Sequence, residues 1–247
     1  MLAGIREVLI ITTPRDSESY KELIGDGSSI GMNISYEEQV KPEGLAQALI
    51  LGEKFLGQEK FAMILGDNFF YGAGLPNTLA NAQIFAGAQI FVYEVSNPEN
   101  YGVLALSNNG SPKSVIEKPI LPQSNMAITG LYFFDQDAIS FAKEATPSKR
   151  GELEITFVIN QYLKQGRLNF TRLSRGVAWL DTGNPNSLHD AASLVKIIEE
   201  RTGHKIACIE EIAWRNNWIS DSQLLEIASS FTINDYGNYL RKLLIHD

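Results

Sequence analysis

The chain has 247 residues, of which 44% are hydrophobic and 20% are charged, and its formal net charge is -8. This length supports a sizeable buried core, and the apolar fraction excludes wholesale disorder. A surface that coats nucleic acid needs clustered Lys and Arg, so 29 acidic against 21 basic residues argue against that class of protein. A small anionic ligand stays compatible with the composition, provided that local cations or a metal hold it.

Cysteine and histidine give little support for metal or nucleophilic chemistry. Cys208 is the only cysteine, so no internal disulfide and no multi-cysteine metal site can form. His189, His204 and His246 are far apart in the sequence and read as surface residues. The G-x-S-x-G motif of a Ser-His-Asp hydrolase is absent. Without a recognisable signal peptide or a membrane-length apolar run, we expect a reduced, cytoplasmic protein.

The first strand is predicted over residues 6–12. Its apolar run Val8-Leu9-Ile10-Ile11 does not alternate, which is typical of a strand that is covered on both faces. Met1 to Gly4 in front of it reads as the end of a helix with a glycine stop. The sequence therefore looks as if it began inside something longer.

Helical and strand patterns then alternate along the chain. Helices are expected over residues 16–24, 44–56 and 75–85, and strands over residues 33–39, 61–65 and 89–95. Such alternation predicts a mostly parallel sheet with helices on both faces.

Residues 102–134 contain short strand candidates that are separated by turn signals, which indicates a mixed extension of the sheet rather than a new domain. After it we expect a helix over 152–165, strands over 168–173 and 177–180, and an amphipathic helix over 187–201. Two or three short helices follow over 210–244. The prediction is one Rossmann-like α/β domain over 1–247.

Gly25-Asp26-Gly27-Ser28-Ser29-Ile30-Gly31 superficially resembles a dinucleotide fingerprint. Its spacing is wrong, and it follows a helical pattern instead of opening one, so no helix N-terminus faces a phosphate there. We interpret it as a turn, which leaves a Rossmann oxidoreductase without support.

Two aspartates follow apolar strands. Asp67 comes after Phe61 to Leu65, and Asp181 comes after Val177 to Leu180. Ligands of α/β sheets bind beyond the carboxyl ends of strands, and carboxylates there can hold Mg²⁺ against phosphate oxygens. A turn or helix cap is the alternative interpretation of each aspartate, and the pair is more suggestive than either alone.

Three further segments are chemically suggestive. Glu117 and Lys118 come just after a strand predicted over 114–116, where Lys could bind a phosphate and Glu could bind sugar hydroxyls, although this pattern alone favours a solvated surface pair. Arg150 precedes an acidic helix start and is either a surface residue or free to reach an anion. Gly44 opens a helix and would let a flat ring approach the backbone closely.

Together these segments resemble the bacterial glucose-1-phosphate thymidylyltransferases of the sugar-nucleotide pyrophosphorylase superfamily. Matching stretches run in family order along essentially the whole chain and include LIGDGSSIGMNISY, GLAQALILGE, LGDNFFYG, NPENYGV, IEKP, SNMAITGLYFFD, SKRGELEIT and RGVAWLDTG. Each stretch is weakly specific, whereas the ordered set is highly specific.

The resemblance implies Mg²⁺-dependent transfer of a thymidylyl group from dTTP to glucose 1-phosphate, giving dTDP-glucose and pyrophosphate. It also implies a homotetramer with C-terminal helices involved in regulation, and a place in dTDP-rhamnose and polysaccharide biosynthesis. The resemblance implies binding roles for the matching residues. Gln39 and Gly44 would bind thymine, Asp67 and Asp181 would bind Mg²⁺, and Lys118 and Arg150 would bind the sugar phosphate. Glucose would be bound by Tyr101, Gly102, Glu117, Ile128, Gly130 and Trp179.

The sequence departs from the family pattern at its start, where a first strand, a G-x-G-T-R-L loop and a helix are not present. That loop offers N–H groups and an Arg to the triphosphate, so we expect a poor catalyst. Without the strand, backbone groups of the sheet lose partners, so we also expect a poorly stable monomer. The alternative function is a catalytically impaired homologue that binds sugar nucleotide or pairs with a full-length subunit. Phe157 and Ile159 are also atypical, as is Val40-Lys41.

Overall fold

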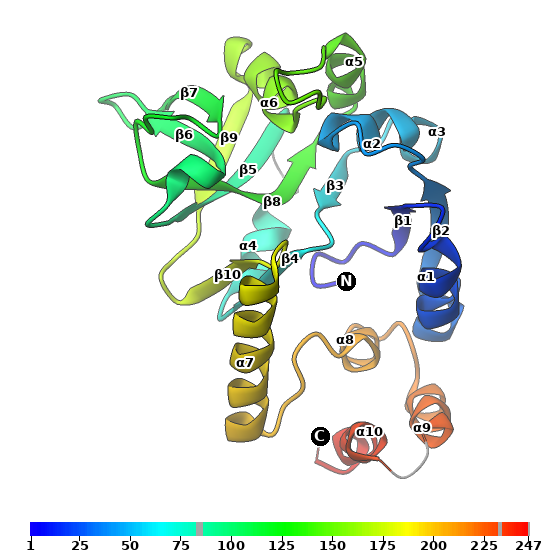
Figure 1. Cartoon of the computed structure of the whole chain (residues 1–247). Helices are drawn as coiled ribbons and strands as arrows, with labels where there is room; N and C mark the ends of the chain where they lie inside the picture. The colour runs from blue at the N-terminus through cyan, green and yellow to red at the C-terminus, as the bar shows by residue number, and fades with distance from the viewer. Residues whose placement is uncertain (83–85, 232–233, 247) are drawn as a thin grey trace. The chain divides into compact units, whose positions relative to one another are not determined.

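The computed structural model describes residues 1–82, 86–231 and 234–246 (Figure 1). These residues form two compact units. The first combines Met1–Val40 with His189–Asp247, and the second is Lys41–Leu188. Each unit has a hydrophobic core of its own. A single domain over the whole chain stays a prediction.

The second unit is built on a six-stranded sheet with the strand order β7-β6-β8-β5-β9, and β3 also pairs with β8. Its strands are β3 (Phe61–Ile64), β5 (Ala88–Glu94), β6 (Gly102–Leu106), β7 (Pro112–Glu117), β8 (Met126–Phe134) and β9 (Leu168–Arg172). Strand β8 is buried along its whole length and runs antiparallel to β3, β5 and β6. The α/β class and the mixed extension are confirmed. The prediction of a mostly parallel sheet is wrong for this unit, because β8 pairs antiparallel with each of its neighbours, and among the described pairings of this sheet only β5 with β9 is parallel.

Helices α2 (Leu45–Leu51), α5 (Asp137–Glu144) and α6 (Ile155–Lys164) pack together against this sheet (Figure 1). Ala46 and Leu49 of α2 and Val158 of α6 lie in the same apolar cluster as strand β5. The Tyr162 ring stacks on Phe134 with a centroid distance of 5.9 Å. The remaining helices of this unit are α3 (Glu53–Leu56), α4 (Leu75–Ala82) and the short η2 (Pro98–Asn100).

A two-stranded antiparallel ribbon joins distant parts of the second unit. Strand β4 (Asn68–Gly72) pairs with β10 (Val177–Asp181), and Asn68 is registered opposite Asp181. Because Asp67 directly precedes Asn68, this register brings the two aspartates predicted at strand ends to the same end of one ribbon. The Thr182 N–H donates to the Asp67 carbonyl oxygen at 2.8 Å and continues the pairing by one residue.

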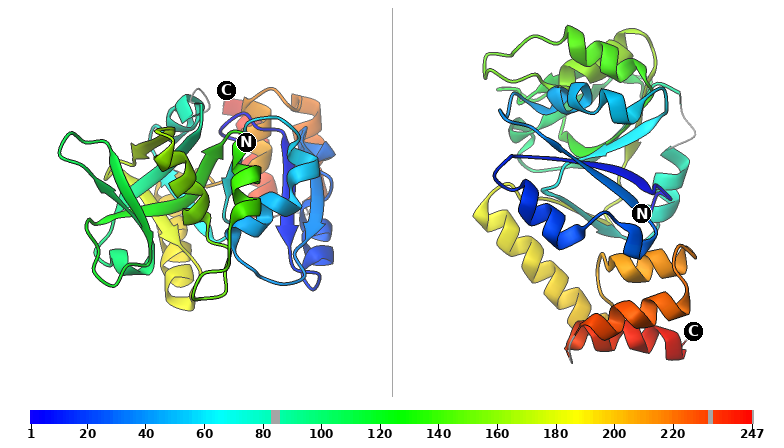
Figure 2. Two further views of the ribbon diagram at one scale, coloured as in Figure 1. Left: turned by 90° about the horizontal axis from the view of Figure 1, so that it is seen from above. Right: turned by 90° about the vertical axis from the view of Figure 1, so that its right-hand side faces the viewer.

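In the first unit, β1 (Glu7–Thr12) runs parallel to β2 (Asn33–Glu38), with α1 (Ser17–Ile24) and η1 (Ser28–Ile30) between them in sequence. Helices α8 (Ile209–Arg215), α9 (Asp221–Ser230) and α10 (Asp235–His246) lie together (Figure 2). Their core contains Ile219, Leu224 and Leu240, and also the buried Cys208. Helix α7 (Pro185–Thr202) begins in the second unit and continues in the first.

Several sequence predictions are corrected by the structure. Met1 to Gly4 is a turn and not a helix end, since the Gly4 N–H donates to the Met1 carbonyl oxygen at 2.8 Å. The helix expected over 44–56 is broken into α2 and α3 at Gly52. The helix expected over 152–165 begins only at Ile155, because the Leu153 N–H donates to Glu43 outside any helix. The last three residues of the helix expected over 75–85 lie outside the described residues.

Two strands are less covered than their apolar sequences predict. Residues 8–12 of β1 are half-buried, and among the described residues this strand pairs with β2 alone. Ile64 of β3 is 60% exposed. In contrast, Gly25 to Gly31 forms the predicted turn, closed by left-handed glycines around η1.

Candidate active site

A cavity of about 180 Å³ opens in the second unit between the ends of its strands and the start of α6. Its lining includes these residues that the sequence marked for a site: Tyr101, Gly102, Glu117, Lys118, Ile128, Gly130, Arg150, Trp179 and Asp181. It also includes residues that sequence reasoning missed: Leu45, Leu65, Asn68, Asn100, Tyr132, Glu152, Glu154, Ile155 and Thr156. Lining residues as far apart as Leu45 and Asp181, which are separated by more than 130 positions in the sequence, thus converge on one cavity.

The Asp67 and Asp181 carboxylates face the same point beside Gly183. The position that a Cβ on Gly183 would take lies 3.1 Å from Asp181 Oδ1 and 3.3 Å from Asp67 Oδ2. The Gly183 N–H donates to Asp181 Oδ1 at 3.0 Å and holds that carboxylate in place. Asp67 is exposed and Asp181 is half-buried, so both can be reached from solvent.

This pair of oxygens suits a hard divalent cation. Mg²⁺ is bound in proteins by one or two carboxylates, with substrate phosphates and waters completing the octahedron. In the part of the chain that the structure describes, no group of three or more Asp, Glu, His or Cys side chains is arranged so that it could hold a metal ion. The residues present therefore fit an ion that is shared with a phosphate-bearing ligand rather than one caged by protein alone.

Asn68 links this carboxylate pair to the rest of the cavity. Its Oδ1 accepts hydrogen bonds from the Gly130 N–H at 2.9 Å and from Trp179 Nε1 at 2.7 Å, and its Nδ2 donates to Asp67 Oδ1 at 2.9 Å. Asn68 follows Asp67 directly, but the sequence offered no sign of this role, because β4 was not predicted as a strand.

Trp179 supplies an aromatic wall. Its side chain is buried, and its ring lies 5.2 Å from the Tyr101 ring and 5.9 Å from the Tyr93 ring. Burial, assisted by the negative charge of Asp181, raises the pKa of the Tyr101 hydroxyl. Tyr132 also lines the cavity, and burial, with smaller contributions from Glu117 and Asp67, raises the pKa of its hydroxyl well above the usual range. Both hydroxyls therefore stay neutral hydrogen-bonding groups at physiological pH.

Glu117 lies where Gly102 leaves room for it. The two residues are registered opposite one another in β6 and β7, and a Cβ on Gly102 would lie 3.3 Å from Glu117 Oε2. Burial first and the neighbouring charge of Glu154 second raise the pKa of the Glu117 carboxyl, while Arg150 and Lys118 oppose that shift. A desolvated carboxylate of this kind is a strong acceptor for ligand hydroxyls.

The Arg150 guanidinium is not free, which corrects one interpretation of its sequence position. It forms a 2.7 Å ion pair with Glu152 and two hydrogen bonds to Glu154, and it lies 3.8 Å from Glu117. Three carboxylates around one guanidinium leave the area negatively charged. An anionic ligand must therefore compete with these carboxylates for Arg150.

Lys118 has an unusual backbone. Its φ angle is 41°, in the left-handed region that non-glycine residues rarely occupy, and its N–H donates to the Tyr101 carbonyl oxygen at 3.0 Å. Its side chain is exposed at the edge of the cavity. Backbone strain of this kind gathers at functional sites, so it favours the functional interpretation over a plain surface ion pair.

The two residues predicted to bind thymine lie outside this lining. Gln39 belongs to the first unit, where it follows β2 and its N–H donates to Thr12 at 2.8 Å. Gly44 belongs to the second unit, but the group that lies close against it is the backbone of this chain at Leu153. A Cβ on Gly44 would lie 2.5 Å from the Leu153 backbone. Its neighbour Leu45 lines the cavity instead.

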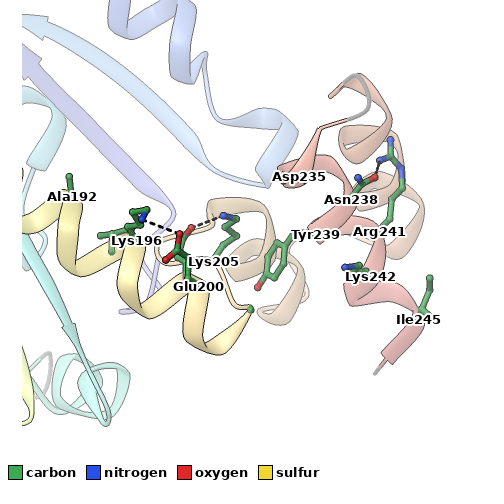
Figure 3. A pocket seen from close by; sticks show the side chains of 13 residues that line it. Ala192, Lys196, Glu200, Lys205, Asp235, Asn238, Tyr239, Arg241, Lys242 and Ile245 are labelled. Carbon is green, nitrogen blue, oxygen red and sulfur yellow. Dashed lines mark hydrogen bonds and ion pairs between the residues drawn. The ribbon is translucent and has the colours of Figure 1, made fainter.

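A larger groove, of about 930 Å³, lies in the first unit between α7 and α10 (Figure 3). Its charged residues mostly satisfy one another. Lys196 pairs with Glu200 at 3.2 Å, and Lys205 pairs with Glu199 at 2.5 Å. Because Glu199 and Glu200 are each paired with a lysine there, the smaller cavity is the better candidate for chemistry despite its size.

The sequence places these features in a known family. The chain belongs to the nucleotidyl transferase family, whose family model matches residues 1–196. Its relatives include glucose-1-phosphate thymidylyltransferases. That of Neisseria meningitidis is 50% identical over 99% of this chain and 85% of its own length, and that of Mycobacterium tuberculosis is 48% identical with the same coverage.

Solved structures agree with this assignment. A Bacillus anthracis structure, described as a glucose-1-phosphate thymidylyltransferase in complex with sucrose, is 36% identical, with a TM-score of 0.70 over 78% of this chain and 77% of that one. A UDP-glucose pyrophosphorylase complexed with UDP-glucose is 25% identical, with a TM-score of 0.68 over 78% of this chain and 82% of its own. The resemblance drawn from the ordered motifs is confirmed. No described helix is long and apolar enough to cross a membrane.

Proposed function

We propose that this chain transfers a thymidylyl group from dTTP to glucose 1-phosphate, forming dTDP-glucose and pyrophosphate. The observation that carries the proposal is the convergence of Asp67 and Asp181 beside Gly183, where Asp181 also lines a cavity walled by Trp179. The choice of substrates is supported by relatives named glucose-1-phosphate thymidylyltransferase, whose sequences are about half identical to this chain over nearly its whole length.

In the reaction, a phosphate oxygen of the sugar phosphate forms a bond to the α-phosphorus of dTTP. The bond from that phosphorus to the bridging oxygen of pyrophosphate breaks, and pyrophosphate leaves with the bonding electrons. Such transfers ask the protein mainly to position two anions and to neutralise their charge. No side chain needs to form a covalent intermediate.

The cavity residues divide into a sugar side and a phosphate side. Glu117, backed by Gly102, accepts hydrogen bonds from sugar hydroxyls, while Trp179 and Tyr101 pack on the apolar face of the ring. Lys118 and Arg150 bind the sugar phosphate, and for Arg150 this requires release from Glu154. Ile128 and Gly130 complete the sugar wall. The resemblance to the family assigns thymine recognition to Gln39 and Gly44, which lie outside the lining of this cavity.

Asp67 and Asp181 hold the divalent ion, and we propose Mg²⁺ because hard carboxylate oxygens suit it. When bound, the ion supplies charge neutralisation on the phosphate oxygens. We further propose that the protein acts in the cytoplasm as a homo-oligomer, a tetramer by its resemblance to the family, within dTDP-rhamnose and polysaccharide biosynthesis.

The test follows pyrophosphate release from dTTP and glucose 1-phosphate in the presence of MgCl₂. We expect Asp67→Asn and Asp181→Asn each to lower turnover at least about 10²-fold, the usual cost of one preorganised electrostatic group. Asp190→Asn, on an exposed aspartate of α7, is the matched control and should leave turnover unchanged. Release that survives both substitutions contradicts the role proposed for this carboxylate pair. Sugar nucleotide binding without any release favours the binding-only alternative.

A further inference from the structure

The orientation of the Asn68 side-chain amide is determined by its surroundings. The Gly130 backbone N–H and the Trp179 indole N–H can only donate, so both must face the amide oxygen. The amide nitrogen then faces Asp67 and donates to Oδ1 at 2.9 Å. Asn68 is half-buried. Its three partners are held by the strands, because Gly130 lies in β8, Trp179 lies in β10, and Asp67 directly precedes β4.

The bond from Asn68 separates the two oxygens of Asp67. Oδ1 accepts the amide, while Oδ2 is the oxygen that lies 3.3 Å from the Cβ position on Gly183, where Asp181 Oδ1 lies at 3.1 Å. A carboxylate otherwise rotates easily about its last side-chain bond. The amide therefore keeps Oδ2 directed toward the partner carboxylate.

We propose that Asn68 is a positioning residue that fixes Asp67 for divalent-metal binding and couples it, through Trp179, to the aromatic wall of the cavity. This inference rests on the proposed function, because it needs the carboxylate pair to hold a metal. Partners that hydrogen-bond to a metal ligand typically account for 10- to 100-fold in metal affinity.

Gly130 provides an independent way to disturb Asn68. A Cβ on Gly130 would lie 2.6 Å from Asn68 Cγ and 2.7 Å from its Oδ1, so any larger residue must displace the amide. Gly130→Ala thus moves Asn68 without altering its chemistry, whereas Asn68→Ala removes the amide and leaves Gly130 as it is. In the double variant, the Ala at 130 meets no amide to displace.

The experiment titrates the full chain with Mn²⁺ alone and measures the free ion by electron paramagnetic resonance. We expect Asn68→Ala and Gly130→Ala each to weaken Mn²⁺ binding about 10-fold or more. The double variant should bind Mn²⁺ no more weakly than Asn68→Ala, because the two substitutions act on one bond. If one single variant fails to fold, the other still tests the positioning role.

Asn160→Ala is the matched control. Asn160 is another half-buried amide of the second unit, and its Nδ2 donates to Val115 and Thr156 carbonyl oxygens. It should lower the melting temperature without changing Mn²⁺ affinity. Wild-type affinity in Asn68→Ala or Gly130→Ala, or additive losses in the double variant, overturns the positioning role.

Asp67→Asn and Asp181→Asn distinguish failure of the positioning role of Asn68 from failure of the proposed metal site. If these variants lose Mn²⁺ binding while Asn68→Ala keeps it, the positioning role alone fails. If they keep Mn²⁺ binding as well, the metal site of the proposed function fails.

Discussion

The guanidinium of Arg150 is bound to both oxygens of the Glu154 carboxylate, from Nε to Oε1 at 3.2 Å and from Nη2 to Oε2 at 3.0 Å. Ser148 Oγ also donates to Glu154 Oε1 at 2.7 Å, which orients the carboxylate. Glu154 is mostly buried, whereas Arg150 is more than a third exposed. This arrangement holds the arginine that the proposed function needs at the sugar phosphate.

Glu154→Gln should therefore strengthen the binding of glucose 1-phosphate. Removing the charge weakens the competing ion pair and frees Arg150 for the ligand. Since partly exposed ion pairs contribute up to about 1 kcal/mol, we expect a gain of up to about fivefold in affinity, measured by calorimetry. Glu152→Gln, whose carboxylate is more exposed and makes one contact, is the control and should have a smaller effect. Weaker binding in Glu154→Gln would show that Glu154 prepares Arg150 rather than competes for it.

Glu117 should make the protein less stable as the pH rises. Its pKa is raised in the folded chain, chiefly by burial, so between the ordinary and the raised pKa the folded state binds more protons than the unfolded state. The free energy of unfolding then falls as the pH increases through that window. Glu117→Gln removes this dependence. We expect a higher melting temperature at pH 7.5 and a smaller difference from wild type at pH 4.

The same substitution should weaken glucose 1-phosphate binding, because an amide accepts sugar hydroxyls less strongly than a carboxylate does. Thermal unfolding at both pH values and calorimetry test the two halves separately. Glu152→Gln serves again as the control, since its carboxylate is 43% exposed. A melting temperature that falls at pH 7.5 would contradict the burial argument.

Gly44→Ala should destabilise the second unit strongly. The added Cβ would lie 2.5 Å from the Leu153 N and O atoms, and φ at this position is 107°. Gly57→Ala is the matched control, because Gly57 has a positive φ of 57° but nothing within 4 Å of its Cβ position. We expect Gly57→Ala to cost about 1 kcal/mol of unfolding free energy and Gly44→Ala at least about 2 kcal/mol more. Equal losses in denaturant unfolding would show that Leu153 moves aside.

The sequence leads to Asp67 and Asp181 as candidates because each is predicted to follow a short apolar strand, and strand ends are where ligands of α/β sheets bind. Their meeting point depends on the register of β4 with β10, a pairing between segments more than 100 residues apart. Asn-Phe-Phe-Tyr-Gly after Gly66-Asp67 was not recognised as a strand. The role of Asn68 was therefore not predictable, since it follows from that strand.

Arg150 and Gly44 show a second limit. The acidic run after Arg150 suggests a helix start with Arg150 either at the surface or free to reach an anion. Instead, residues 152–154 lie outside any helix, with Glu154 extended, and turn two carboxylates toward Arg150. The same extended segment lies against Gly44, so the glycine accommodates Leu153. Local periodicity predicts which residues join a helix, whereas these contacts are made between segments that only the tertiary fold brings together.

Two substitutions of Lys118 separate the effect of its charge on ligand binding from the effect of its backbone strain on stability. Lys118→Ala and Lys118→Gly both remove the ammonium, so both should weaken glucose 1-phosphate binding more than dTTP binding. A charge-assisted hydrogen bond that becomes desolvated on binding contributes about 1.5–3 kcal/mol, which corresponds to about a 10- to 150-fold loss. The two variants should differ in stability, because Ala keeps the cost of a left-handed φ of 41° and Gly does not.

We expect Lys118→Ala to melt close to wild type, and Lys118→Gly to melt higher by a few degrees at most. Left-handed strain costs about 1–2 kcal/mol, and the greater freedom of glycine in the unfolded chain cancels about half of that. Lys113→Ala, on the exposed lysine at the start of the same strand, controls for the loss of a surface charge. Calorimetry with each ligand and thermal unfolding give the two readouts. Unchanged affinity in both variants returns Lys118 to a surface role, and a Gly variant that melts below the Ala variant contradicts the strain argument.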